Sequence, residues 1–150
     1  HKEKHFNEAI NHYEYVIKID PSIVFAHYNL GLIHEKLGNI EKAKKNYQMA
    51  IKVKPLFVNP YNNLGIISQQ QGQKEKAIEY FEKVVELDPK NLHGYNNIGL
   101  VYASLGEYEK ALESYFKSLA IDKANIVAVK SIIFLMFNLI VVKLNIEIKS

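Results

Sequence analysis

A column of asparagines is the feature of this sequence best suited to bind another molecule. Asn29, Asn63 and Asn97 lie 34 residues apart along the chain. A carboxamide both donates and accepts hydrogen bonds, so a row of them could pair with the backbone amides of an extended peptide while ignoring its sequence. The alternative is that these asparagines bond the backbone of their own fold.

The titratable residues form no recognisable catalytic or metal-binding motif. The sequence has no cysteine, which excludes a thiolate nucleophile, a disulfide and a zinc site built on sulfur. It also has no glycine-rich phosphate loop, Gly-x-Ser-x-Gly elbow or His-Glu-x-x-His helix. His1, His5 and His12 share one side of a predicted helix, but no carboxylate or cysteine completes a convincing ligand set. We therefore expect no enzyme activity, no bound metal and no cofactor.

The composition is that of a globular protein and not of a nucleic-acid binder. The chain has 150 residues, of which 48% are apolar and 23% charged, enough for one domain with a real core. All 19 basic residues are lysines, and against 16 acidic residues they leave a net charge of only +3. Nucleic-acid binders concentrate positive charge on one face and use arginine to contact bases and phosphates. The absence of cysteine suits a reducing compartment, and no signal peptide is visible, so we expect a cytoplasmic location.

The asparagines belong to a longer internal repeat with a period of 34 residues. Periods of 20 to 50 residues are typical of solenoids and other repeat architectures. The columns that recur at this period are Asn29/Asn63/Asn97, Gly31/Gly65/Gly99, Gly38/Gly72/Gly106, Ala43/Ala77/Ala111, Tyr47/Phe81/Tyr115 and Pro21/Pro55/Pro89.

Each period contains two predicted helices. Apolar residues recur at helical spacing over 25–37 and again over 40–53, and Gly38 with Asn39 supplies the turn between them. Because one hairpin cannot bury both of its faces, successive hairpins must stack into a solenoid.

Small and aromatic residues of the repeat predict how the helices pack. We expect Gly31 and Ala43, and likewise Gly65 and Ala77, to face each other where the two helices of a hairpin cross. The aromatic column that contains Tyr47 is then expected to fill the gap to the next hairpin.

These repeats resemble the tetratricopeptide repeat (TPR) family, whose 34-residue motif carries Leu-Gly, a turn glycine, alanine, an aromatic residue and proline at set positions. The resemblance covers roughly residues 1–125 and implies an all-α, right-handed superhelical solenoid of helix hairpins. His27 and His34 stand where aromatic residues are usual, and Lys123 stands where the last proline would be. The resemblance divides the chain into a second helix of a partial repeat at 1–23, whole repeats at 24–57, 58–91 and 92–125, and a divergent apolar helix at 126–150.

In each whole repeat, the first helix presents a face opposite its packed stripe, and this face is expected to line a concave groove. We call it the groove face. It comprises Phe25, Tyr28, Asn29, Leu32, Glu35 and Lys36; Asn59, Asn62, Asn63, Ile66, Gln69 and Gln70; and His93, Asn96, Asn97, Leu100, Ala103 and Ser104. The residues expected to contact a bound peptide are Tyr28, Asn29, Leu32, Asn59, Asn62, Asn63, Ile66, Gln69, His93, Asn96, Asn97 and Leu100.

The resemblance implies a non-enzymatic scaffold that binds an extended or disordered segment of another protein. The asparagine column and strings such as Tyr-Asn-Asn-Leu-Gly also resemble the repeats of O-GlcNAc transferase. The alternative function is therefore substrate recognition for a glycosyltransferase of that kind, with its catalytic domain outside these residues.

The last segment departs from the repeat. In 126–150, 16 of 25 residues are Ile, Val, Leu, Phe or Met, and neither glycine nor proline occurs. Its most apolar run, 131–142, would span about 18 Å as a helix, short of the ~30 Å hydrocarbon core of a membrane. Three interpretations stay open: a membrane-spanning helix, a helix docked on Leu112, Phe116 and Leu119, or a junction whose covering partner is absent.

A docked helix would leave part of its apolar surface uncovered. We expect Ile132, Leu135 and Leu139 to face the preceding repeat. An exposed face containing Ile133, Phe137 and Ile140 would then favour self-association.

Overall fold

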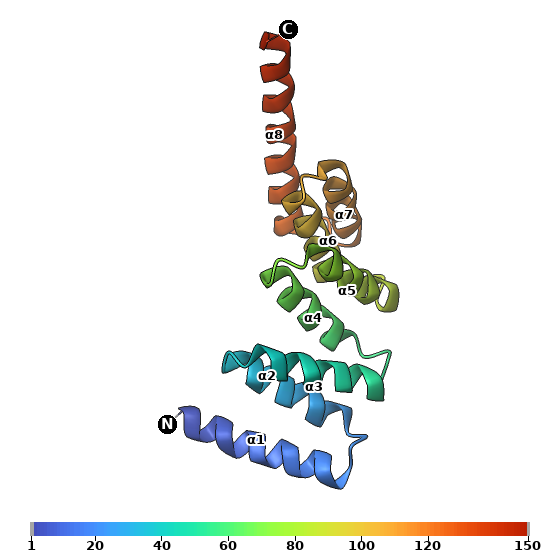
Figure 1. The fold of residues 1–150 in the computed structure, drawn as a ribbon. Coiled ribbons are helices and arrows are strands. Elements are labelled where there is room, and N and C mark those ends of the chain that lie inside the picture. Colours follow the sequence, from blue (N-terminus) through green and yellow to red (C-terminus); the bar gives the residue numbers. More distant parts are fainter. Residues whose placement is uncertain (1, 150) are drawn as a thin grey trace.

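The chain forms a stack of helices that follow one another in space in the order of the sequence (Figure 1). The computed structural model describes residues 2–149, with side chains described for residues 5–141 and 144. Within residues 2–149 there are eight helices and no strand. The helices are α1 (Lys2–Ile19), α2 (Val24–Lys36), α3 (Ile40–Val53), α4 (Val58–Gln70), α5 (Lys74–Leu87), α6 (Leu92–Ser104), α7 (Tyr108–Ile121) and α8 (Ile126–Lys149).

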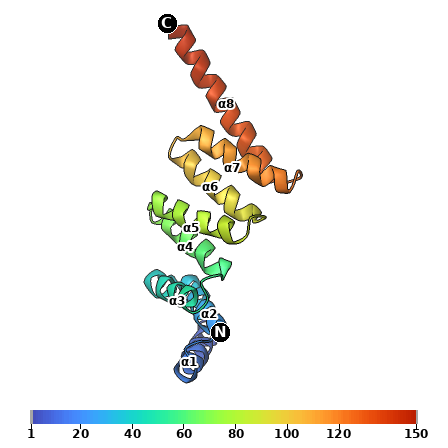
Figure 2. The ribbon, with the colours of Figure 1, turned by 90° about the vertical axis from the view of Figure 1, so that its right-hand side faces the viewer.

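Six of the helices form three hairpins, and the hairpins stack. Within each hairpin, α2 packs against α3, α4 against α5, and α6 against α7. The second helix of each hairpin also packs on the first helix of the next, and α1 packs on α2 in the same way. Figure 2 shows the resulting elongated stack, with α1 at one end and α8 projecting from the other. The predicted all-α solenoid is confirmed.

Each hairpin turns at a glycine in the left-handed backbone region. Gly38 and Gly72 have a φ of +74°, and Gly106 a φ of +78°, a conformation that side chains bearing a Cβ rarely adopt. Around Gly38, the amide of Asn39 donates to the carbonyl of His34, and the amide of Gly38 donates to that of Glu35. These two bonds satisfy carbonyls at the end of α2 and reverse the chain, so that α3 returns beside it.

A second column of glycines sets the distance between the two helices of a hairpin. A Cβ built on Gly65 would lie 2.5 Å from Cε1 of Phe81, and one built on Gly31 would lie 2.6 Å from Cε1 of Tyr47. The ring on the second helix therefore occupies the space that a side chain on the first would need. Ala77 is fully buried, as its small size suggests. The Phe81 ring is what a Cβ on Gly65 would meet first, and the expected contact between Gly65 and Ala77 stays a prediction.

The same aromatic rings join each hairpin to the next. Tyr47 clusters with Leu64 and Ile67 of α4, and Phe81 clusters with Ile98 and Val101 of α6. Both rings are completely buried. The prediction that the aromatic column fills the gap between hairpins is confirmed, and the core is continuous along the stack because each ring contacts two hairpins.

One side of α8 is docked on the last hairpin. Ala128, Ile132 and Leu135 are buried against Ala111 and Tyr115 of α7, with Leu112 and Leu119 beside them. The docked-helix interpretation is therefore confirmed for this side.

Two residues that were expected to take part in docking α8 are less buried than expected. Leu139 is only half-buried, and Phe116 is 51% exposed and lies outside the cluster. Within residues 2–149, we find no helix that is both long and apolar enough to cross a membrane.

The contact between Gly65 and Phe81 leads to a prediction about stability. At an ordinary helix position, Gly→Ala stabilises by about 1 kcal/mol. Here Gly65→Ala is expected to lower the free energy of unfolding by about 1–3 kcal/mol, because the new methyl group collides with a buried ring. Chemical denaturation measures the change.

A double variant and a surface control test that explanation. Phe81→Leu should remove part of the collision, so the two changes together should cost less than the sum of their separate costs. Gln70→Ala, on the exposed side of the same helix, should change stability by no more than about 0.5 kcal/mol. Unchanged or increased stability of Gly65→Ala would contradict the assigned packing.

Candidate functional site

The groove face lies on the first helices of the three hairpins, α2, α4 and α6. Most of the residues expected to contact a peptide are half-buried, and three of them, Asn59, His93 and Leu100, are exposed. The half-buried ones are Tyr28, Asn29, Leu32, Asn62, Asn63, Ile66, Gln69, Asn96 and Asn97. A half-buried side chain can pack on its neighbours and still present part of its surface to a ligand.

The asparagine column bonds to tyrosines of the preceding repeat. Asn29 donates through Nδ2 to the hydroxyl of Tyr13 at 3.2 Å, and Asn63 donates to the hydroxyl of Tyr47 at 2.9 Å. In both pairs the tyrosine lies 16 residues before the asparagine, on the second helix of the previous repeat. The column is thus tied to side chains across the junction between repeats.

The third member of the column has a different partner because its tyrosine is missing. Phe81 stands at the equivalent position and has no hydroxyl. Asn97 instead donates to Oδ1 of Asn62 at 3.3 Å. A similar carboxamide pair links Asn125 to Asn96 at 3.4 Å.

These bonds use only one end of each carboxamide. Within the part of the chain that the structure describes, we find no hydrogen bond to Oδ1 of Asn29, Asn63 or Asn97. Each side chain therefore has its Nδ2 held by the fold and keeps an acceptor for another donor. A peptide N–H is a donor of the kind that such an acceptor takes.

Glu35 forms the centre of a polar network at the junction of the first two hairpins. Its Oε2 accepts from the hydroxyl of Tyr47 at 2.5 Å and from Nδ2 of Asn63 at 3.3 Å. Burial raises the pKa of Tyr47 far above its usual range, and the bond to Glu35 raises it further. Tyr47 therefore stays protonated and donates to the carboxylate.

Aromatic side chains surround this network. The rings of Tyr28 and Tyr47 have centroids 5.8 Å apart, and Phe57 packs edge-on against Tyr28 at 5.1 Å and against Phe25 at 5.4 Å. Burial raises the pKa of Tyr28 as well. Phe25 remains 58% exposed, so this end of the groove face presents an apolar surface.

A pocket that sequence reasoning missed lies away from the groove face. It has a volume of about 400 Å³ and is lined by residues of α5, α6 and α7. The lining residues are Glu82, Val85, Tyr95, Ile98, Tyr102, Lys110, Glu113, Ser114 and Lys117. Its charges are largely satisfied locally, because Lys117 pairs with Glu113 at 2.7 Å and Lys110 pairs with Glu107 and lies over the Tyr102 ring. The sequence feature that could have indicated this pocket is the pair Tyr95 and Tyr102, which stand at the positions of His27 and His34 in the third repeat. Aromatic residues at these positions are the ordinary pattern of a packed helix face, so they did not stand out.

The histidines contact neighbouring protein groups and are not gathered into one site. His27 is buried, and its Nε2 lies 3.0 Å from the carbonyl oxygen of Pro21. His5 lies 3.7 Å from Glu8 on the surface of α1. Among the described residues, no group of three or more His, Asp or Glu side chains is arranged to hold a metal ion.

His34 is a buried histidine with an unsatisfied nitrogen. It is 5% exposed, and its Nδ1 has no hydrogen-bond partner. Burial lowers the pKa of His34, and the charge of Lys42 on α3 lowers it further, while Glu14 on α1 opposes the shift. The folded state therefore holds this side chain in its neutral form.

Comparison with known families agrees with this geometry. A model of the tetratricopeptide repeat matches residues 24–56, 58–91 and 94–125, and a second TPR model matches residues 1–38. The chain belongs to the TPR family. Proteins built from TPR repeats are typically non-catalytic modules of protein–protein interaction. No curated protein matches this TPR chain in sequence.

Solved structures with the same fold include two crystal structures of MamA. The first has a TM-score of 0.81 at 28% sequence identity, and the match covers 91% of this chain and 80% of that one. The second has a TM-score of 0.79 at 28% identity, covering 89% and 73%. In all, 306 solved chains match, so the likeness identifies a TPR scaffold and selects no particular partner.

His34 gives the fold a predicted sensitivity to acid. Its pKa in the folded state lies below 6.5, so the unfolded state takes up a proton first as the pH falls. The contribution of His34 to stability is thus complete above about pH 7 and declines as the pH falls through about 6.5. His34→Gln should flatten this decline, as measured by denaturation midpoints between pH 5 and 8.

A surface histidine supplies the control for this experiment. His12→Gln, on the exposed side of α1, should leave the pH dependence of the wild type unchanged. The quantity compared is the slope of the denaturation midpoint with pH. This slope can be compared even if His34→Gln changes the overall stability. Equal slopes for the wild type and His34→Gln would show that this side chain is not the acid-sensitive group.

Proposed function

We propose that this TPR protein binds an extended segment of another protein along its groove face, and that the asparagine column contacts the backbone of that segment. The observation that supports this proposal most directly is the state of the carboxamides. Their Nδ2 groups are held by neighbouring side chains, whereas the structure provides no donor for their Oδ1 atoms within the described residues. Acceptors spaced one repeat apart suit the repeating N–H groups of an extended chain.

The proposed binding mode does not depend on what the bound segment does next. A scaffold would hold a partner in this way, and a glycosyltransferase would hold a substrate in this way. Both uses require the same contacts, and the scaffold role is the one that the TPR family supports for the residues at hand.

Replacing the column tests the binding proposal. The triple variant Asn29→Ala, Asn63→Ala and Asn97→Ala should lose binding to peptides selected by the wild-type protein from a random display library. Its circular dichroism should remain that of the parent, although each lost internal bond costs about 0.5–1.5 kcal/mol. Binding is measured by fluorescence anisotropy with the selected peptides.

Two tyrosines provide a matched control for the internal bonds. Tyr13→Phe with Tyr47→Phe removes the hydroxyls that hold Asn29 and Asn63 but keeps the carboxamides, and Phe81 shows that the fold accepts phenylalanine at this position. We expect this variant to retain most of the peptide affinity. If it loses binding as completely as the alanine variant, or if the alanine variant binds normally, the column does not act by direct contact.

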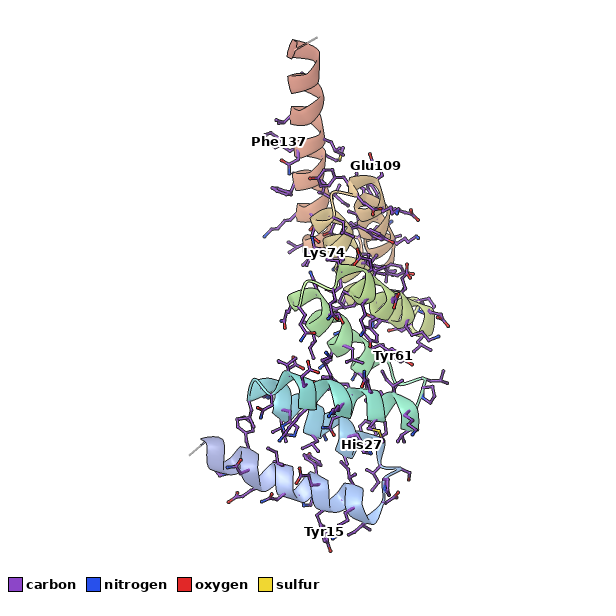
Figure 3. All side chains as sticks on the ribbon, viewed as in Figure 1. Tyr15, His27, Tyr61, Lys74, Glu109 and Phe137 are labelled. Atoms are coloured by element: carbon purple, nitrogen blue, oxygen red, sulfur yellow. The ribbon has the colours of Figure 1, made fainter. Side chains whose placement is uncertain are left out.

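We also propose that two copies of the chain associate through α8. Its side away from α7 is apolar, with Ile133, Phe137 and Ile140 exposed by 63%, 65% and 55%. Phe137 lies on the part of α8 that projects from the stack (Figure 3). This row, spaced by four and three residues, forms a stripe along one side of the helix.

The position of this stripe in the repeat explains why it is uncovered. Ile133 stands where the other repeats have the close-approach glycine, and Ile140 stands where they have the turn glycine. Without the turn, α8 continues for 24 residues, whereas the other first helices have 13. Without the small residue, a helix carrying a large aromatic ring cannot approach as closely as α3 approaches α2.

A second copy of α8 is the occupant that fits this stripe. The stripe carries no charge, so it pairs well with another uncharged apolar helix face, and an identical face satisfies that need under two-fold symmetry. Each large side chain left more than half exposed presents roughly 100 Å². The three side chains of the stripe thus present roughly 300 Å², and the exposed Phe134 and Leu144 of the same helix add to this area, against the roughly 800 Å² that each partner contributes to a standard interface.

Charged substitutions test self-association. Ile133→Lys, Phe137→Glu and Ile140→Lys together should shift the protein to the monomer in analytical ultracentrifugation while helix content stays unchanged. The control Tyr15→Lys with Ile19→Glu alters equally exposed apolar residues of α1 and should leave the wild-type mass unchanged. A monomeric wild-type protein would refute the proposal, as would flotation of the wild type with liposomes that the charged variant does not show.

A further inference from the structure

We propose that the groove face selects a lysine in the bound segment, and that Glu35 is the residue that selects it. This inference rests on the proposed function, because it concerns a segment held by the asparagine column. It adds a sequence preference at one position to a binding mode that otherwise ignores sequence.

Glu35 is the only acidic residue of the groove face. Its equivalents in the next two repeats are Gln69 and Ala103, which carry no charge. The other charge on this face is the exposed Lys36. Within the described residues, no ammonium group lies within ion-pair distance of the Glu35 carboxylate.

The fold holds this carboxylate with neutral donors only. The Tyr47 hydroxyl and Nδ2 of Asn63 both bond to Oε2. We find no bond to Oε1 among the described residues. A half-buried carboxylate that lacks a counter-charge is stabilised when a cation binds it, and the stabilisation is greater than at a fully exposed site because less water screens the pair.

The carboxylate lies directly beside the asparagine column. Oε2 is 3.3 Å from Nδ2 of Asn63. A segment whose backbone contacts Asn63 therefore carries a side chain within reach of Glu35. This adjacency is what links the charge to the bound segment.

The geometry favours lysine over other side chains. With Oε2 already occupied, Oε1 offers one acceptor, which suits the point charge of an ammonium group better than the two-pronged contact of arginine. The half-buried ring of Tyr28, whose centroid lies 5.8 Å from that of the buried Tyr47, can pack against the aliphatic part of a lysine.

Selection from a random peptide library tests the preference. Peptides selected by the wild-type protein should be enriched in lysine at one position, and peptides selected by Glu35→Gln should not. Glutamine keeps an acceptor for Tyr47, and Gln69 shows that the repeat accepts it at this position. Circular dichroism and the melting temperature establish that the variant is folded.

Affinity measurements with one selected peptide then locate the contact. Replacing its lysine by glutamine should weaken binding to the wild type about three- to tenfold. Replacing the lysine by arginine should weaken binding less, because the positive charge is kept. The same replacement should have no effect on binding to Glu35→Gln, because the partner charge is already gone. Raising the salt concentration should reduce the preference.

Two further variants complete the design. Glu86→Gln removes an acidic residue that pairs with Lys83 on α5, away from the groove face, and should leave the lysine preference intact. Gln69→Glu introduces a carboxylate at the equivalent position of the next repeat and should create a second lysine preference.

The outcomes separate this inference from the proposed function. If the wild type selects peptides and the triple alanine variant of the asparagine column selects none, the binding proposal holds. If peptides bind but lysine is not enriched, or is enriched equally by Glu35→Gln, only the lysine inference is refuted. If the wild type selects no peptide, both are refuted.

Discussion

The close approach of two helices at a glycine is the contact on which the rest of this solenoid depends. At Gly31, Gly65 and Gly99 a Cβ would fall within 2.8 Å of a ring atom of Tyr47, Phe81 or Tyr115. Each ring sits on the glycine of its own hairpin and continues into the core of the next. The same glycine–aromatic pair in each repeat therefore determines both how the two helices of a hairpin pack and how successive hairpins stack.

The aromatic column also links the core to the groove face. Tyr47 has its ring in the core and its hydroxyl at Glu35 and Asn63, so the same side chain fixes the packing and positions the polar groups. Where phenylalanine replaces tyrosine, at Phe81, the packing is preserved but the hydroxyl is lost, and Asn97 turns to Asn62. The polar character of the groove face consequently differs from repeat to repeat although the backbone does not.

The helix α8 shows what happens when these constraints are removed. Ile133 and Ile140 replace the two glycines that the repeat needs for close approach and for the turn. The side of α8 that faces α7 still follows the repeat, with Ala128, Ile132 and Leu135 buried around Tyr115. Within the described residues no helix covers the opposite side, and its apolar residues are exposed.

Much of this architecture was accessible from the sequence, because a 34-residue period repeats the same local physics in each unit. Helical spacing, the turn glycines and the small and aromatic columns predicted the hairpins, their stacking and the docked side of α8. The approach of the Phe81 ring to Gly65 was not accessible, because the ring conformation depends on the space left by the next hairpin. The hydrogen bonds of the asparagine column and of the Glu35 network were not accessible either, because they join residues 12 to 35 positions apart. The pocket beside α6 is likewise formed by residues of three different helices. Such contacts depend on the angle at which the helices cross, and that angle is decided by the packing of the whole stack.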